Sequence, residues 1–210
     1  MRKISPAILL TAVMVLFLLS ATASAQSAPQ WEIFGGGTWL RADISPDLQD
    51  FGLAHVRAIG WNFSGTQNAT NWFGVTLDLS GAYSRPEIIV SPTETLTNEF
   101  NFSVYTFMAG PTFALRRSDR IVPFGRVLLG AVHDRVKTTS KGALLIGDVS
   151  ASETHFGVGA GGGVDVAISR MLAVRGTADL IHSTFGDFDD DRQNSVRVSA
   201  GIVFRFGMKP

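Results

Sequence analysis

The sequence predicts an all-β fold of antiparallel strands, and three observations carry this prediction. After residue 30, apolar residues alternate with small or polar ones, which is the period of a strand with one apolar face. The connections between the alternating segments are short and long in turn. Only 17% of the residues are charged while 22 are glycine and 15 are phenylalanine, a balance unlike that of an average soluble protein.

Composition also excludes several functions. The 210 residues contain 18 basic and 18 acidic side chains, so no excess of positive charge favours a nucleic-acid partner. The chain has no cysteine, which excludes disulfides, thiolate metal sites and cysteine nucleophiles.

Residues 1–25 predict a secretory signal peptide. Arg2 and Lys3 precede an apolar run of about a dozen residues, and an A-x-A cleavage motif ends at Ala25. The alternative is an uncleaved anchor, which the run disfavours because a spanning helix needs about 18 apolar residues. We expect a mature domain of residues 26–210, in which the loss of two basic residues leaves 16 basic against 18 acidic.

The first four segments show the alternation as follows. Trp31 and Trp39 share one face of the first segment, and the second contains Trp61. In the third, the apolar residues at odd positions of 73–79 alternate with Gly, Thr and Asp. In the fourth, residues 107–115 at odd positions oppose Gly, Thr, Ala and Arg at even ones. Each segment therefore has one apolar face.

The last four segments follow the same rule with one ambiguity. The fifth is apolar on both faces, and we expect Arg126 and Gly130 to point inward. The sixth alternates large apolar residues with glycines and Asp165, and the seventh has one face of Arg, Thr and Asp. The eighth places Val, Ala, Ile and Phe at the even positions of 196–206.

These segments predict an up-and-down barrel of eight strands, each long enough to cross a bilayer at a tilt. The predicted strands are residues 30–42, 52–64, 71–84, 99–116, 121–135, 153–168, 171–184 and 194–207. Short turns are expected at 65–70, 118–120 and 169–170, and long loops at 43–51, 85–98, 136–152 and 185–193. This alternation is typical of outer-membrane hairpins, with both termini in the periplasm.

Period two alone does not separate a membrane barrel from a soluble ligand-binding barrel, which stays the alternative from another class. Side-chain distribution favours the membrane, because one face is bulky and apolar whereas the other mixes Gly, Ser, Thr, Asp and Arg. We therefore expect a transmembrane β-barrel with aromatic residues at the membrane interfaces: Trp31, Trp39, Trp61 and Phe206.

The chain resembles the small outer-membrane β-barrel domain family, the OmpA/OmpX-like eight-stranded barrels. The resemblance rests on Gly60-Trp61-Asn62-Phe63, Asn71-Trp72-Phe73-Gly74-Val75, Phe124-Gly125-Arg126-Val127-Leu128-Leu129-Gly130, Gly161-Gly162-Gly163-Val164-Asp165 and the segment 196–206. It implies a location in the bacterial outer membrane after Sec export. It also implies insertion by the outer-membrane assembly machinery, which recognises a last strand ending in an aromatic residue, here Phe206.

Charged residues on the predicted inner face are the candidate functional site. An unpaired charge inside a narrow barrel is costly, so we expect ion pairs across neighbouring strands. The candidates are Glu32, Asp78, Arg126, Asp165, Arg175, Asp179, Arg197 and Arg205, and we expect Asp165, Arg175, Asp179 and Arg197 to form one network. We favour a static polar core. The resemblance suggests the alternative, which is a gate whose ion pairs rearrange to open a small pore.

The function expected from these residues is non-enzymatic: an envelope-structural barrel or a low-conductance pore. The alternatives are adhesion through extracellular loops and, less favoured, a lipid A-modifying enzyme using His182, Ser183 and Thr184. Such an enzyme needs a carboxylate to orient the histidine, and the neighbours on the same face of this strand are apolar.

We expect no cofactor and no metal site. The four histidines fall on different strands without metal-ligand spacing, and a solvated loop explains the aspartates at 187–191 better than a cation site does. Gly161 to Gly163 lie within a strand and fit close packing rather than phosphate binding. The expected partners are outer-membrane lipid and lipopolysaccharide, whose phosphates the basic loop 137–141 could contact, and the chain is expected to be monomeric.

Overall fold

The structure is a computed structural model that describes residues 28–43, 55–84, 87–89, 97–141, 149–184 and 192–208. These residues form nine strands. They are β1 (Pro29–Asp43), β2 (His55–Asn68), β3 (Phe73–Ser84), β4 (Glu87–Ile89), β5 (Thr97–Ala114), β6 (Ile121–Lys141), β7 (Val149–Ala167), β8 (Leu172–Thr184) and β9 (Arg192–Met208). No helix in these ranges is long and apolar enough to span a membrane.

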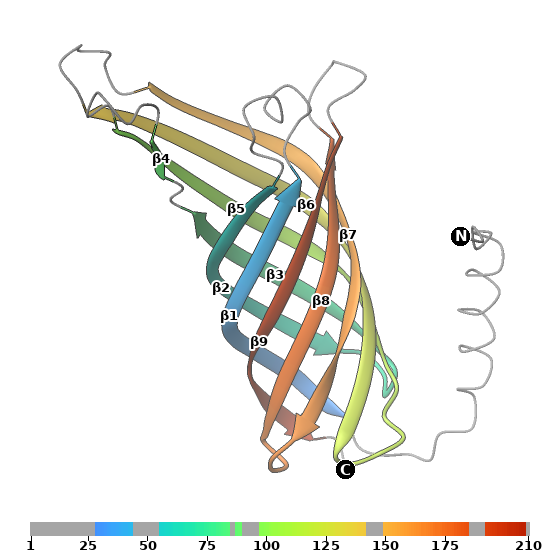
Figure 1. The fold of residues 1–210 in the computed structure, drawn as a ribbon. Helices are drawn as coiled ribbons and strands as arrows, with labels where there is room; N and C mark the ends of the chain where they lie inside the picture. The colour runs from blue at the N-terminus through green and yellow to red at the C-terminus, as the bar shows by residue number, and fades with distance from the viewer. Residues whose placement is uncertain are drawn as a thin grey trace, which may run out of the picture.

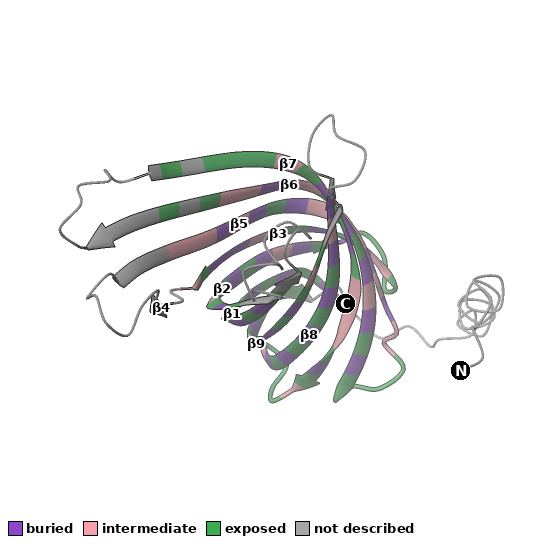
Figure 2. Cartoon of the chain, turned by 45° about the horizontal axis from the view of Figure 1, so that its top comes forward, coloured by how far each residue is buried: buried purple, intermediate pink, exposed green. Residues whose placement is uncertain are grey.

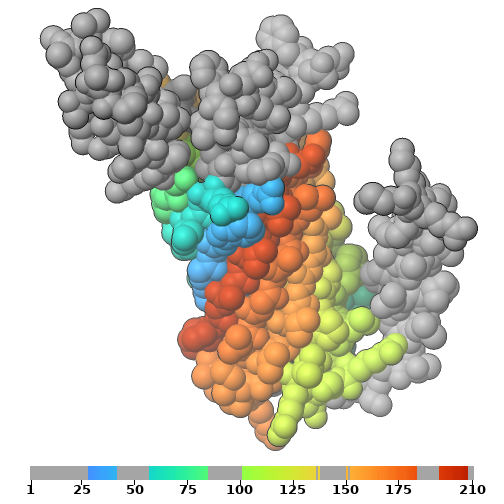
Figure 3. Space-filling model, in the orientation of Figure 1, coloured from blue at the N-terminus to red at the C-terminus, as the bar shows by residue number. Residues whose placement is uncertain are grey.

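Eight long strands close into an antiparallel barrel (Figure 1). Each pairs with its neighbours in sequence, and β1 pairs with both β2 and β9, so the sheet has no free edge between the first and last strands. The short strand β4 only extends the outer edge of β5. Figure 3 shows β1, β2, β8 and β9 side by side as a continuous wall. The predicted eight-stranded up-and-down barrel is confirmed.

The register fixes how far the strands are staggered. Paired residues can be followed from strand to strand around the barrel, starting at Glu32 of β1. The path returns to β1 at Ala42, so the shift is 10 residues (42 − 32). Gly110 is taken to face Leu128 by continuity of the β5 and β6 register. The path passes through Thr66, Thr76, Gly110, Leu128, Gly159, Ile181 and Ser195. With eight strands, this stagger tilts the strands and leaves an interior that side chains can fill.

The two ends of the barrel differ. Residues 69–72, 115–120 and 168–171 form short turns, and we call this the short-turn end. The opposite, long-connection end carries the longer segments between strands, which lie largely outside the described residues. There β5, β6 and β7 extend beyond the other strands (Figure 1).

Most strand bounds agree with the sequence prediction to within two residues, and two places differ by more. β2 continues to Asn68, so the predicted turn at 65–70 is wrong and the turn lies at 69–72. The reason is that β2 still pairs with β3 there, and the Thr66 and Thr76 hydroxyls are 2.8 Å apart. β6 and β7 also extend through parts of the predicted 136–152 loop, because their pairing continues to Thr138 and Val149.

Burial alternates along the strands, and Figure 2 shows buried and exposed residues as alternating bands. Large apolar side chains are exposed on the outer face of the barrel, as at Ile59 (72% exposed) and Leu77 (64%). The buried set instead contains many hydroxyl, amide and charged side chains. This inverted distribution is that of a barrel whose outer face contacts hydrocarbon.

The inner face is more apolar than the sequence indicated. Phe34, Phe124 and Val203 are buried inside, as are the members of an apolar layer: Leu40, Ala58, Ala82, Val104, Met108, Leu128, Val132 and Ile181. The expectation that the inner face mixes Gly, Ser, Thr, Asp and Arg therefore leaves out these apolar residues, of which only those of the fifth segment were indicated by its two apolar faces. Small residues alone leave voids in a barrel of this width, and these larger side chains fill them.

Candidate functional site in the barrel lumen

All eight charged residues selected from the sequence point into the lumen. Their exposed fractions run from 0% for Asp78 to 8% for Arg205, so water reaches almost none of them. Each lies on the buried side of its alternating strand. Their geometry divides them into two separate groups.

Four of these residues form a closed ring, which we call the central ring. Arg126 contacts Asp179 at 2.7 Å and Asp78 at 3.1 Å. Arg197 contacts the same two carboxylates, Asp179 at 3.0 Å and Asp78 at 2.7 Å. Acid and base therefore alternate around the ring, and each charge has two opposite neighbours. The ring is electrically balanced, which a buried cluster requires.

Neighbouring strands supply polar groups that hold the ring in place. The Asn62 amide donates to Asp78 at 3.1 Å. One terminal nitrogen of Arg197 donates to the hydroxyls of Ser80 and Thr106, at 3.0 and 3.2 Å. These hydrogen bonds add partners to the ion pairs and lower the cost of burying the ring, although Asn62 Oδ1 and Asp78 Oδ1 have no hydrogen-bond partner among the described residues.

Gly161 makes room for the ring. It pairs directly with Asp179 across β7 and β8. A Cβ at position 161 would overlap the backbone carbonyl of Ala178 and the carboxylate of Asp179. The mid-strand glycine is therefore explained by the approach of a carboxylate, in agreement with the predicted role in close packing.

The remaining charges form an open chain nearer the short-turn end, which we call the end chain. Its contacts run from Arg116 to Glu32 (2.7 Å), from Glu32 to Arg175 (2.6 Å), from Arg175 to Asp165 (2.6 Å) and from Asp165 to Arg205 (3.0 Å). It contains three bases and two acids. Its two terminal members are both arginines.

Aromatic rings support the middle of the end chain. The guanidinium of Arg175 lies 4.6 Å from the centre of the Phe124 ring and 5.9 Å from that of Phe34. Cations are attracted to aromatic faces, more strongly where water is excluded. Asn68 adds an amide hydrogen bond to Glu32 at 3.1 Å.

The structure corrects the predicted network in two ways. Asp165 with Arg175 and Asp179 with Arg197 are both direct pairs, but they belong to different groups, so the single network of four is wrong. Arg116 belongs to the end chain and was missed. Arg116 lies two residues after Ala114, the last residue of β5, and continues the inward parity of Thr112 and Ala114.

The apolar layer lies beyond the ring toward the long-connection end. Ala82, Leu128 and Ile181 follow the ring residues of β3, β6 and β8 by two to four positions in that direction. The end chain lies on the other side of the ring. End chain, central ring and apolar layer are thus stacked along the barrel axis.

The residues considered for catalysis and metal binding are placed as follows. His182 lies 2.9 Å from the amide oxygen of Asn194, and Ser183 is buried on the opposite face. The side chain of Thr184 and the aspartates at 187–191 lie outside the described residues. In the described part of the chain, no three His, Asp or Glu side chains are placed to hold a metal ion.

The remaining histidines are also dispersed. His133 contacts Thr154 at 2.8 Å, and His155 lies 3.4 Å from Glu153. The side chain of His55 lies outside the described residues, as do those of 138–141 in the predicted basic loop.

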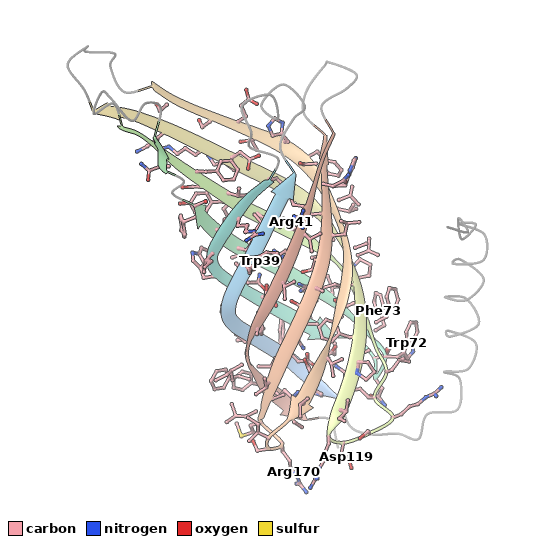
Figure 4. All side chains as sticks on the ribbon, viewed as in Figure 1. Trp39, Arg41, Trp72, Phe73, Asp119 and Arg170 are labelled. Carbon is pink, nitrogen blue, oxygen red and sulfur yellow. The ribbon has the colours of Figure 1, made fainter. Side chains whose placement is uncertain are left out.

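Aromatic side chains are exposed near both ends of the outer face. The exposed fractions are 45% for Trp31, 38% for Trp39, 43% for Trp61 and 42% for Phe206. Trp72, which the sequence prediction did not include, is 54% exposed and stacks on Phe113 with 6.1 Å between ring centres. Figure 4 shows Trp72 near the short-turn end and Trp39 toward the other end.

A closed antiparallel barrel with an apolar outer face and a lumen filled by paired charges defines an integral outer-membrane β-barrel protein. Residues 11–204 match the family described as outer membrane protein beta-barrel domain. The chain belongs to this family, as its resemblance predicted, and the known members are bacterial outer-membrane proteins.

Solved structures show the same fold. The attachment invasion locus protein Ail of Yersinia pestis aligns with a TM-score of 0.55 and 21% identity, covering 84% of this chain and 99% of Ail. Neisserial surface protein A aligns with a TM-score of 0.57 and 15% identity over 86% of this chain and 100% of its own. OprG of Pseudomonas aeruginosa aligns with a TM-score of 0.52 and 11% identity, covering 88% of this chain and 99% of OprG. A search of curated protein sequences finds no match.

Proposed function

We propose that the protein is a non-enzymatic outer-membrane barrel with a closed lumen, which acts through its presence in the envelope and its outer surface. The central ring carries this proposal, because its four charged side chains are at most 3% exposed and each has two opposite partners. Opening a path through the ring requires breaking several buried ion pairs. The apolar layer next to the ring adds a second barrier to ions.

Planar-bilayer conductance of the refolded mature chain tests the closed lumen. We expect no discrete channels in the wild-type protein. A refolded open porin in the same bilayer serves as the positive control. Stable channels in the wild type would overturn the closed-lumen proposal.

A gated low-conductance pore is the second candidate, and the sharing of carboxylates favours it. Asp78 and Asp179 each contact both Arg126 and Arg197, so a base can move between carboxylates without becoming fully unpaired. In this case the wild type shows rare channels, and Asp179→Asn and Arg197→Gln change their frequency. Silence in all three proteins would exclude the gate.

Export and orientation complete the proposal. We assign residues 1–25 as a cleaved signal peptide, the short-turn end to the periplasm and the long-connection end to the cell exterior. The N-terminal residue of protein purified from outer membranes tests the cleavage, with Gln26 expected. A mature chain beginning at Met1 would contradict it.

A further inference from the structure

Two exposed arginines lie side by side on the outer face of the barrel. Arg41 of β1 and Arg57 of β2 are direct partners in the register, and both side chains are exposed. They continue the outward parity of Trp39 and Ile59. Figure 4 shows Arg41 just beyond Trp39 toward the long-connection end. The Cβ atoms of directly opposed residues lie about 5 Å apart, so the two guanidiniums can reach one ligand.

Such a pair is unfavourable unless an anion accompanies it. Like charges directly opposite each other on neighbouring strands destabilise a sheet. Among the residues that the structure describes, no acidic side chain forms an ion pair with Arg41 or Arg57. By contrast, the lumen arginines of the ring and chain are all matched to carboxylates. The outer pair is therefore a cationic site without a described partner.

Neighbouring aromatics place this pair at the membrane boundary. The indole of Trp61 donates to the hydroxyl of Tyr83 at 3.3 Å, and Tyr83 meets Tyr105 edge-on with 5.9 Å between ring centres. Aromatic residues with one polar edge collect where hydrocarbon meets headgroups. Arg41 lies two residues beyond Trp39, and Arg57 two beyond Ile59, in the direction of the exterior. Both guanidiniums are thus at the headgroup level of the outer leaflet.

We propose that Arg41 and Arg57 together bind a phosphate group of a phosphorylated glycolipid in the outer leaflet. Guanidinium groups match phosphate oxygens in bidentate geometry, and two of them can share one dianionic phosphate. Trp39 and Trp61 lie just below and contact the adjoining part of the lipid. The site rests on the proposed outer-membrane orientation and names the lipid class that this surface selects.

Titration of the refolded barrel with lipid A tests the site. The probes are lipid A carrying both phosphates and the same lipid with its phosphates removed. The test variant is Arg41→Gln/Arg57→Gln. The matched control is Arg120→Gln/Arg170→Gln, which removes the same charge from exposed positions in the short turns at the opposite end.

For phosphorylated lipid A, we expect the test variant to lose affinity by about tenfold or more and the control by less than about twofold. The dephosphorylated lipid should bind the wild type as weakly as it binds the test variant. Equal losses in both double variants, or no preference for phosphate, would overturn the site. Equal binding to phosphatidylglycerol vesicles would show a general anionic surface instead.

Two checks keep the outcomes separate. The single variant Arg41→Gln should give an intermediate loss, and circular dichroism should show that every variant is folded. Conductance of the same samples reports on the lumen alone. Channels would therefore overturn the closed-lumen proposal without affecting the phosphate site. Lost selectivity for phosphorylated lipid A would overturn the phosphate site without affecting the closed-lumen proposal.

Discussion

The central ring and the end chain use the same chemistry but differ in closure. In the ring, two acids and two bases alternate, and every member has two partners. In the end chain, Arg116 and Arg205 are terminal and contact one carboxylate each, while Arg175 at the middle contacts two. The chain also has an excess of one base, and its two ends are the most exposed members. Closure, rather than the number of ion pairs, therefore distinguishes the two groups.

This difference predicts how each group responds to losing a member. A ring that loses an acid leaves two bases on one carboxylate in a dry interior, where uncompensated charge is most costly. When the end chain loses a terminal arginine, the carboxylate next to that arginine keeps Arg175 as a partner. Substitutions should therefore be severe anywhere in the ring and graded along the chain.

The largest effect is expected for Asp179→Asn. It leaves Arg126 and Arg197 to share Asp78, and breaking a buried ion-pair group in this way costs about 3–5 kcal/mol. Urea unfolding of the barrel refolded in lipid vesicles, followed by tryptophan fluorescence, measures the free energy of unfolding.

The double variant Asp179→Asn/Arg197→Gln is the control for this prediction. It restores charge balance by leaving the single pair of Asp78 with Arg126. Its cost should therefore be smaller than the sum of the two single costs. Additive costs would show that the four residues do not act as a ring.

Val198→Arg should give the next largest effect. Val198 follows Arg197 on β9 and is 43% exposed on the outer face, whereas Arg197 is 1% exposed inside. The same guanidinium is stable at 197 because two carboxylates meet it. At 198 it faces hydrocarbon on the inner side of the interfacial Trp39, its partner in the register, and costs about 2 kcal/mol, less than at the bilayer centre. Refolding yield into vesicles and urea unfolding measure the loss. Val198→Leu should be close to neutral, and an equally neutral Val198→Arg would contradict the outward assignment.

This contrast between neighbouring positions explains why so much of the barrel could be predicted from sequence. Alternation along one strand assigns each residue to a face, and the inward placement of Asp78, Arg126 and Asp165 needs no knowledge of the other strands. Pairs within one hairpin follow from the register of that hairpin, as for Asp179 with Arg197.

Contacts across the lumen could not be predicted in the same way. Arg126 of β6 reaches Asp78 of β3, with β5 between the two strands. Which residues meet there depends on the tilt and stagger of the whole barrel, a property of the closed sheet rather than of a local pattern. Arg116 was missed for the same reason: alternation along 107–116 puts it on the polar face, but its contact with Glu32 of β1 joins strands that are not neighbours.

Gly161→Ala tests the packing around the ring without changing its charge. The new methyl group must displace Asp179 or the β8 backbone, and overpacking of this kind costs about 1–3 kcal/mol. Gly176→Ala is the matched control, because the exposed Gly176 has open space where its Cβ would be. Urea unfolding should separate the two alanine variants. Equal stabilities would show that the carboxylate of Asp179 does not need the space at 161.

The smallest effect is expected at the end of the chain, for Arg205→Gln. Asp165 keeps two hydrogen bonds from Arg175, at 2.6 and 2.8 Å, so no buried carboxylate is left unpaired. The variant also removes the excess base of the chain. We expect a loss of about 1 kcal/mol in urea unfolding, the range of a partly replaceable charged hydrogen bond. A cost equal to that of Asp179→Asn would mean that the open chain is as cooperative as the ring, and closure would then not be the property that sets the stability of buried charges in this lumen.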